Sequence, residues 1–191
     1  MAAATKKQKD TARPLAVTLV LDRPVNAANE DKLIRLVTRL VDAGIAHLAI
    51  IYEGAAHPAS WGFDLRPLRR VEIGPGSTSQ HFSSDRFVLT LLPPASGKAV
   101  VAAAARSLAT KGQGQVTVDR LEASINDIAG RAPDLVIVTG GAPNLRGSLT
   151  WQAAYGEFVF CERPWTELAG SDLDHALKEF AARGRRFGGL A

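Results

Sequence analysis

The sequence has little cysteine and no long apolar run, and both absences exclude whole classes of protein. Its 191 residues contain a single cysteine, Cys161, so an internal disulfide is excluded and a reducing compartment is indicated. We expect Cys161 to pack as a small hydrophobic residue, because no partner base marks it as a nucleophile. No apolar run approaches the roughly 18 residues that cross a bilayer, and no hydrophobic segment follows the lysines of residues 1–10. We therefore expect a cytoplasmic protein without a transmembrane segment.

Charge and aromatic content argue against a nucleic-acid partner. The net charge is +4, and the basic residues collect at Lys6–Lys9, at Arg66–Arg70 and at Arg183–Arg186. Aromatic residues make up only 6% of the chain and are not interleaved with basic residues in any stretch. A platform for single strands or RNA needs that interleaving, so we expect the chain to bind no nucleic acid.

Short apolar runs alternate with amphipathic segments. Apolar runs of strand length occupy residues 15–21, 45–52, 86–92, 134–139 and 157–161. Helical spacing or composition predicts helices over residues 29–43, 97–111, 117–128 and about 171–183, with a helical turn at 151–155. Because the strands are apolar on both faces and separated by helices, the fold class is α/β. We expect a largely parallel central sheet of about six strands, covered by helices on both faces.

Two details of this organisation are more local. Prolines and glycines punctuate residues 53–85, which we predict to be rich in loops. Ser171-Asp-Leu-Asp174 has the pattern of a capping box that opens the last helix.

We expect residues 1–13 to form a disordered basic tail and residues 14–191 to form one domain.

Glycine-rich stretches offer few candidates for phosphate binding. Residues 74–77 form a turn with no helix behind it, and Ser96-Gly97-Lys98 lacks the first glycine of a Walker loop. Thr139-Gly140-Gly141 directly follows a strand, where its backbone amides would either face an anion or simply form a loop.

Three ordered blocks resemble the carboxyl-terminal half of cis-prenyltransferases, a family that includes undecaprenyl diphosphate synthase. They are Pro133–Gly141 (PDLVIVTGG), Leu149–Phe160 (LTWQAAYGEFVF) and Arg185–Gly189 (RRFGG). Trp165 and the last predicted helix also stand where the family has them. The resemblance covers residues 87–189 well and residues 15–54 loosely. It implies the family's fold and prenyl transfer between isoprenoid diphosphates.

The departures from the family pattern fall on the diphosphate ligands. Catalytic members bind the allylic diphosphate and Mg²⁺ through an Asp-Gly-Asn-x-Arg segment after the first strand, where this chain has Asp22-Arg23-Pro24-Val25. The family's ligands for isopentenyl diphosphate are replaced by Val138, Asn144 and Arg146. Because neighbouring phosphate charges need paired donors, we expect these losses to be severe. A ligand role for Asp22 or Arg146 stays open.

The same losses are typical of the non-catalytic subunits of heteromeric cis-prenyltransferases, of which the Nogo-B receptor is the animal example. Residues 92–99 and 43–52 are similar to that branch. Arg186-Phe187-Gly188 matches the Arg-x-Gly motif that, in the family, reaches the diphosphate in the partner's active site. The resemblance therefore implies a catalytic partner subunit that holds most of the Mg²⁺, with Arg186 and Gly188 binding isopentenyl diphosphate in trans.

Other interpretations stay open. Without the resemblance, the basic end of the last helix is a solvated helix terminus. Glu157 is a weaker candidate with an indirect metal role. The chain can also be a self-sufficient, diverged prenyl diphosphate enzyme that uses Asp22 and Arg146, or a scaffolding partner without a part in chemistry. The sequence does not determine product length, the partner's identity, or heterodimer against heterotetramer. We expect the complex to lie in the cytoplasm or at the membrane periphery.

Overall fold

A seven-stranded sheet forms the centre of the computed structural model, which describes residues 14–75, 77–94, 97–110, 115–142 and 151–183. The strand order is β3-β4-β5-β2-β1-β6-β7. The strands are β1 (Ala16–Val20), β2 (His47–Ile51), β3 (Arg66–Gly74), β4 (Ser77–Ser83), β5 (Val88–Leu92), β6 (Leu135–Val138) and β7 (Glu157–Phe160). The five adjacent strands β5, β2, β1, β6 and β7 are parallel to one another, as the apolar runs predicted.

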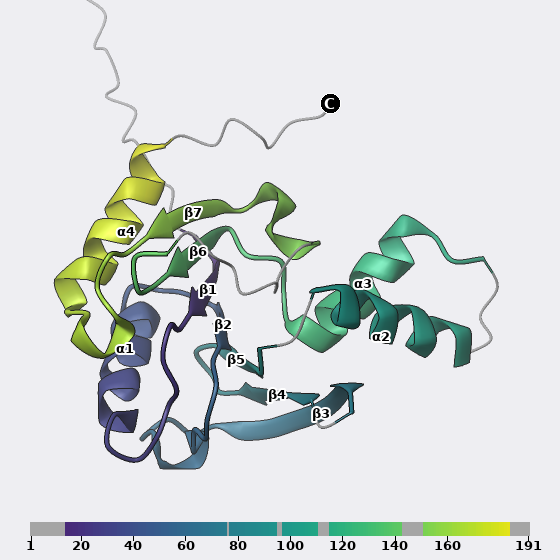
Figure 1. Cartoon of the computed structure of the whole chain (residues 1–191), viewed down its shortest axis with the longest axis horizontal. Coiled ribbons are helices and arrows are strands. Elements are labelled where there is room, and N and C mark those ends of the chain that lie inside the picture. Colours follow the sequence, from purple (N-terminus) through teal and green to yellow (C-terminus); the bar gives the residue numbers. More distant parts are fainter. Residues whose placement is uncertain (1–13, 76, 95–96, 111–114, 143–150, 184–191) are drawn as a thin grey trace, which may run out of the picture.

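Helices cover both faces of this sheet, which confirms the predicted fold class (Figure 1). The helices are α1 (Glu30–Asp42), α2 (Gly97–Thr110), α3 (Val118–Ala129) and α4 (Gly170–Ala182). Helices α1 and α4 pack on one face through residues such as Leu36 and Leu173, and α2 and α3 pack on the other through residues such as Ala104 and Ile128. Strands β1, β2, β5 and β6 are therefore buried on both sides, which explains their continuous apolar sequences, whereas β7 at the end of the sheet is partly exposed.

The parallel arrangement places the ends of β1 and β6 beside each other. Val20 pairs with Ile51 on one side and with Val138 on the other. The residues that follow these strands, including Asp22 and Thr139, consequently lie at one edge of the sheet. Ligands of open α/β sheets bind at this carboxyl edge.

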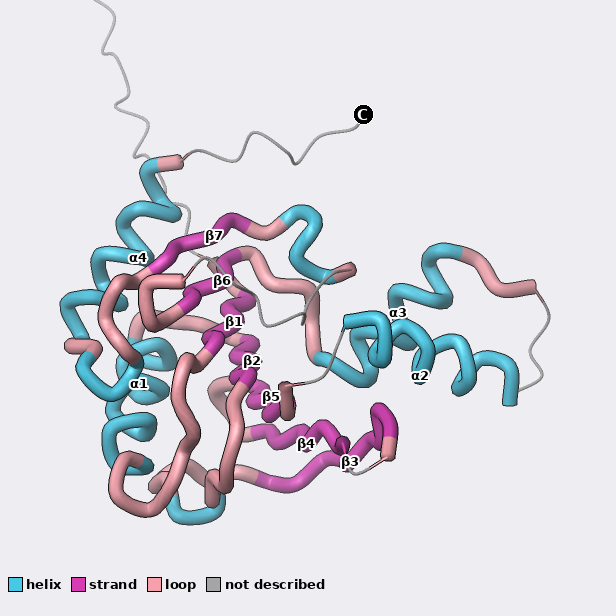
Figure 2. The backbone as a smooth tube through the Cα atoms, viewed as in Figure 1, coloured by secondary structure: helices cyan, strands magenta, loops and turns pink. Residues whose placement is uncertain are grey.

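The prediction of loops over residues 53–85 was wrong in part. Strands β3 and β4 form an antiparallel hairpin that adds two strands at one end of the sheet, with β4 antiparallel to β5 (Figure 2). The apolar pattern is missing because β3 is an edge strand, exposed along most of its length. Pro67 fits there because it stands beside an irregularity in the register, where a missing N–H is tolerated.

Strand β4 buries polar side chains instead of apolar ones. His81 is only 3% exposed, and its ring nitrogens contact the hydroxyls of Ser79 and Thr90, each at 3.2 Å. These contacts satisfy the buried groups, so the strand is stable although its sequence is not hydrophobic.

The start of α4 also differs from the prediction. The helix begins at Gly170, so Ser171 lies inside it and Ser171–Asp174 is not its capping box. Asp172 Oδ2 accepts the N–H of Ala169 at 2.6 Å, one half of a capping box placed two residues earlier. Asp174 instead binds Arg39 on α1 through two hydrogen bonds of 2.8 and 2.6 Å.

Candidate functional site

The candidate site lies where β1 and β6 end, and Asp22 is its central residue. The Thr139 hydroxyl donates to Asp22 Oδ1 at 2.7 Å, and the backbone N–H of Trp165 donates to the same oxygen at 2.9 Å. The N–H of Asp22 donates to the Thr139 hydroxyl oxygen at 3.1 Å. These bonds join Asp22 to two segments that follow it by 117 and 143 residues in the sequence.

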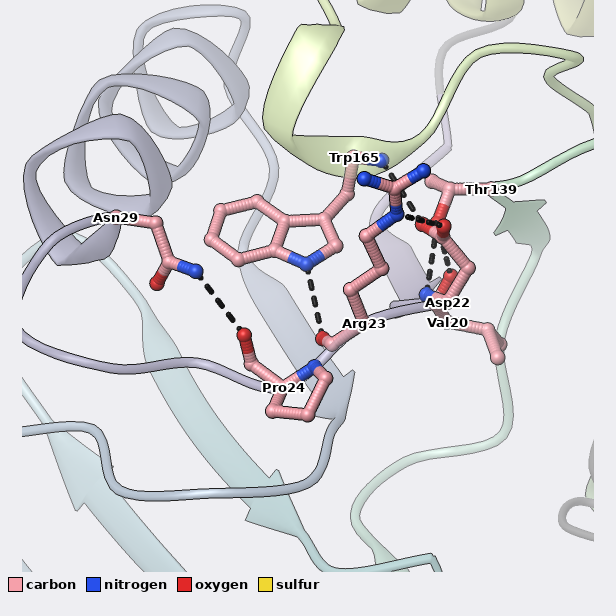
Figure 3. A network of polar contacts seen from close by, with 7 residues as sticks. All are labelled: Val20, Asp22, Arg23, Pro24, Asn29, Thr139 and Trp165. Atoms are coloured by element: carbon pink, nitrogen blue, oxygen red, sulfur yellow. Dashed lines mark hydrogen bonds and ion pairs between the residues drawn. The ribbon is translucent and has the colours of Figure 1, made fainter.

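Two further contacts fix the turn after Asp22 (Figure 3). The indole Nε1–H of Trp165 points at the carbonyl oxygen of Arg23 and donates to it at 2.9 Å, and Asn29 Nδ2 donates to the carbonyl oxygen of Pro24 at 3.0 Å. Trp165 is fully buried, at 0% exposed, between the sheet and α1 and α4. The buried side chain of Trp165 therefore fixes the turn after Asp22 to the hydrophobic core.

The charge of Asp22 is stabilised by these protein contacts. Burial alone would raise the pKa of its carboxyl. The hydrogen bonds from Thr139, from Trp165 and from its own backbone, with the nearby Arg23, lower the pKa below its ordinary value. Arg23 Nε lies 3.4 Å from Asp22 Oδ2. The carboxylate is consequently ionised, and both of its oxygens contact donors of this chain.

Residues 139–141 form a loop and not an anion cradle. The Gly140 N–H donates to the Arg163 carbonyl and the Gly141 N–H to the Cys161 carbonyl, each at 3.0 Å. Gly140 also has a φ of +86°, and a Cβ there would lie 2.5 Å from the Cβ of Asp22. Glycine is required at this position because Asp22 packs directly against the backbone.

The loop after β1 is also closed by backbone pairing. The Val25 N–H donates to the Glu53 carbonyl at 2.7 Å, and the Ala55 N–H donates to the Val25 carbonyl at 3.1 Å, so that Val25 and Gly54 form a parallel bridge. The N–H of Asp22 is bound to Thr139, and Pro24 has no N–H. Three of the four residues from Asp22 to Val25 thus present no unbound amide to a ligand.

A pocket of about 350 Å³ lies beside this loop, at the ends of β2 and β5. It is lined by Tyr52, Glu53, Gly54, Thr78, Gln80, Leu91, Pro93 and Pro94. Its described lining thus contains one carboxylate and no cationic side chain. A diphosphate needs paired cationic donors, so this pocket is poorly suited to one.

The remaining residues singled out from the sequence fall into two groups. Val138 is 2% exposed and packs in the core beneath α2 and α3. Glu157, at the start of β7, accepts a hydrogen bond from Arg183 at 3.3 Å. Arg146, Arg186 and Gly188, together with Asn144 and the basic tail of residues 1–13, lie outside the described residues.

The described residues contain no cluster of three His, Cys, Asp or Glu side chains that would hold a metal ion. Asp22 alone fits Mg²⁺ poorly, because Oδ1 already accepts two hydrogen bonds and Oδ2 lies beside Arg23. Within the same residues, no helix is both long and apolar enough to cross a membrane.

Exposed aromatic side chains lie on β7, which ends the sheet, and on the helical turn just before it, and we call this set of residues the aromatic edge. It comprises Trp151, Tyr155, Phe158 and Phe160. Tyr155 is 91% exposed, Phe160 46% and Trp151 39%, and the rings of Phe158 and Phe160 stack with centroids 6.1 Å apart. Such an exposed apolar surface is typical of a protein–protein contact. Cys161, which follows it, is half-buried against the core, and burial raises its thiol pKa, as fits an unreactive residue.

Sequence reasoning placed Asp22 at the site but missed its partners. Thr139 was considered only as part of a glycine loop, and Trp165 only for its position along the chain. A threonine directly after a buried strand, facing an aspartate after the neighbouring strand, is the signal that would have indicated the pair.

Comparison with known proteins shows related sequences of one family. A sequence model described as "Putative undecaprenyl diphosphate synthase" matches residues 74–188. The isoprenyl transferase of Bacillus subtilis is 30% identical over 167 residues, which are 84% of this chain and 60% of that protein. The chain thus spans less than two thirds of this relative's length.

Two solved structures share the fold at low identity. The probable undecaprenyl diphosphate synthase of Campylobacter jejuni has a TM-score of 0.69 at 16% identity, over 93% of this chain and 100% of that one. Lavandulyl diphosphate synthase of Lavandula x intermedia, in complex with dimethylallyl diphosphate, has a TM-score of 0.67 at 18% identity, over 93% and 99%. With a family match that spans more than half of its residues, the chain belongs to the cis-prenyltransferase family.

Proposed function

We propose that this chain is a non-catalytic subunit of a heteromeric cis-prenyltransferase, which makes a long-chain polyprenyl diphosphate from an allylic diphosphate and isopentenyl diphosphate. The observation that carries the proposal is the state of Asp22. Its carboxylate is bound to Thr139 and Trp165, and the loop that follows is paired with residues 53–55. A segment arranged in this way stabilises the fold and offers little to a diphosphate or to Mg²⁺.

The surroundings of Asp22 support the same conclusion. Val138, at a position where the resemblance implies an arginine, is a buried core residue. The adjoining pocket has Glu53 and no described cation in its lining. Transfer to isopentenyl diphosphate requires cationic groups that stabilise the departing diphosphate. In the proposed complex the catalytic subunit supplies these groups, the catalytic aspartate, the product tunnel and most of the Mg²⁺ coordination.

The aromatic edge is the proposed contact with that catalytic subunit. Phe160 exposes apolar surface on β7, the strand that ends the sheet, and Trp151 and Tyr155 expose it on the helical turn just before that strand. Burial of aromatic side chains supplies much of the energy of protein interfaces. Through this contact the chain stabilises its partner, as a heterodimer or a heterotetramer.

The chemical contribution of this chain is assigned to Arg186 and Gly188. A guanidinium binds diphosphate oxygens through two parallel hydrogen bonds, and glycine lets the backbone come close. The resemblance to the family's Arg-x-Gly motif supports a role for these residues in binding isopentenyl diphosphate in the partner's active site.

Purification of this chain, of a catalytic cis-prenyltransferase from the same organism, and of both together tests the proposal. Each sample is assayed with an allylic diphosphate, isopentenyl diphosphate and Mg²⁺. We expect the pair to co-purify and to be active, and the isolated chain to be inactive. Turnover by the isolated chain that is lost in the Asp22→Asn and Arg146→Ala variants would instead establish a self-sufficient enzyme.

Substitution of Arg186 tests the role in trans. A charge-assisted hydrogen bond contributes roughly 1.5 to 3 kcal/mol, so Arg186→Ala is expected to lower turnover of the complex about ten- to a hundredfold while assembly persists. Lysine should restore only part of the activity, because it lacks the planar pair of donors. Arg185→Ala removes the same charge one residue away and is the matched control, expected to behave as wild type. Wild-type kinetics of the Arg186→Ala complex would leave only a scaffolding role.

A further inference from the structure

A second pocket, of about 230 Å³, lies at the amino edge of the sheet, where β1, β2 and β5 begin. Its lining includes Val17, His47 and Val88, which stand at or beside the first residues of these strands. The candidate site around Asp22 lies at the opposite edge, where β1 and β6 end. The second pocket is therefore a separate feature, and we call it the amino-edge pocket.

The end of α3 forms one wall of the amino-edge pocket. The helix ends at Ala129, and Gly130, its C-cap, has a φ of +82°. A Cβ at Gly130 would lie 2.8 Å from the Thr90 hydroxyl oxygen, so the helix end comes this close to the sheet because the residue is glycine. On the sheet the lining includes Ala49, whose small side chain leaves the neighbouring space unfilled.

The lining carries more positive than negative charge. Its charged side chains are Arg69 on β3, Asp127 on α3 and Arg131 just after α3. Arg69 Nη1 lies 3.2 Å from Asp127 Oδ1, so these two charges largely balance each other. Arg131 is exposed, and it forms no ion pair within the described part of the chain. The pocket thus has one net positive charge, at Arg131.

The His47 ring lies near Arg131 and is half-buried. Burial, and then the positive charge of Arg131, lower the pKa of this ring, while Asp134 acts in the opposite direction. The neutral ring keeps one N–H donor. Both ring nitrogens of His81 contact hydroxyls, whereas no group among the described residues forms a hydrogen bond with the His47 ring. Arg131 and His47 therefore offer donors that the protein itself does not use.

The size and the remaining lining of the pocket restrict the ligand. Leu68, Val88 and Ala49 give the lining an apolar part. A volume of about 230 Å³ holds roughly seven groups of the size of a water molecule, at about 30 Å³ each. A guanidinium binds a carboxylate through two parallel hydrogen bonds. A single net positive charge matches one carboxylate better than a phosphate monoester, which carries nearly two negative charges.

We propose that the amino-edge pocket binds a small monocarboxylate, whose acidic group is held by Arg131 and His47 and whose short apolar body packs against Leu68, Val88 and Ala49. This binding is independent of prenyl transfer and of a catalytic partner, because the pocket lies at the opposite edge of the sheet from Asp22.

Titration of the purified, ¹⁵N-labelled chain with 3-methylbutanoate, a branched carboxylate of matching size, tests the proposal. We expect saturable changes in the amide chemical shifts of His47, Val88, Gly130 and Arg131, with a Kd on the order of 1 mM for so small a ligand. The alcohol 3-methylbutan-1-ol lacks the charge and should cause no saturable change. Inorganic phosphate lacks the apolar body and should bind at least about tenfold more weakly than the carboxylate.

Substitutions in the lining identify the groups that bind the carboxylate. Arg131→Ala should weaken binding about tenfold or more, and Arg131→Lys should restore only part of the loss, since lysine lacks the planar pair of donors. His47→Ala should weaken binding about fivefold, as expected for one lost hydrogen bond. Arg35→Ala removes the same charge from an exposed position of α1, which packs on the opposite face of the sheet, and is the matched control. It should bind as wild type does.

The outcomes that would overturn the proposal are distinct. One is the absence of a saturable change with 3-methylbutanoate at concentrations well above the expected Kd. A second is an unchanged Kd in Arg131→Ala, or an equal loss in Arg35→Ala, which would reveal a general effect of net charge. Shifts that gather at Asp22, Thr139 and Trp165 would move the binding to the carboxyl edge. Phosphate that binds as tightly as the carboxylate would refute the proposed class of ligand.

Discussion

His81 is expected to make the stability of this protein depend on pH, and replacing it with glutamine tests this. The side chain is 3% exposed, and its pKa is lowered to about 4, first by burial and then by the positive charge of Arg69. Asp127 and a hydrogen bond involving the Ile128 backbone act in the opposite direction without cancelling the shift. The fold therefore requires the neutral ring.

The sign and size of the effect follow from proton linkage. The ordinary pKa of histidine is 6.5, so between pH 6.5 and about pH 4 the unfolded chain binds a proton at His81 that the folded chain does not. Stability must then fall as the pH falls through this window. Since the pKa of His81 in the folded chain is about 4, His81 lowers the free energy of unfolding, relative to its value at pH 7.5, by about 2 kcal/mol at pH 5 and by about 3 kcal/mol at pH 4.

The assay is urea unfolding followed by tryptophan fluorescence at pH 7.5 and pH 5. Glutamine keeps a donor and an acceptor but does not titrate, so His81→Gln should lose about 2 kcal/mol less than wild type on acidification, whatever its stability at pH 7.5. His175→Gln, at an exposed position of α4, is the control and should keep the wild-type dependence. Equal pH dependence of wild type and His81→Gln would refute the assignment of a buried, neutral His81.

Two other predictions concern the site around Asp22. Asp22→Asn should lower the free energy of unfolding by roughly 1 to 3 kcal/mol, because it weakens the bonds with Thr139 and Trp165, yet leave kcat of the complex within about twofold. A large loss of kcat with assembly intact would make Asp22 a catalytic residue. Gly140→Ala should lower the free energy of unfolding by about 2 kcal/mol or more, since the added Cβ would clash with Asp22. Gly62→Ala, with φ of +72° but nothing within 4 Å, should lose only about 1 kcal/mol; equal losses would show that the contact with Asp22 is unimportant.

Local patterns in the sequence determined most of the elements. Leu33, Leu36, Val37 and Leu40 recur at helical spacing and indeed form the buried side of α1. The apolar runs became the five parallel strands, because only a strand covered on both faces needs an uninterrupted apolar sequence. The order of those strands and helices was enough to predict the α/β class.

Tertiary structure decided the features in which distant residues meet. Strands β3 and β4 carry no apolar alternation, since one is an exposed edge and the other buries His81 in polar contacts that depend on Thr90 of β5. The contacts of Asp22 also depend on distant residues, because its partners Thr139 and Trp165 follow it by 117 and 143 residues. The sequence alone showed an acidic residue after a strand. Whether its carboxylate faces a ligand or supports the fold depends on which donors the folded chain brings beside it.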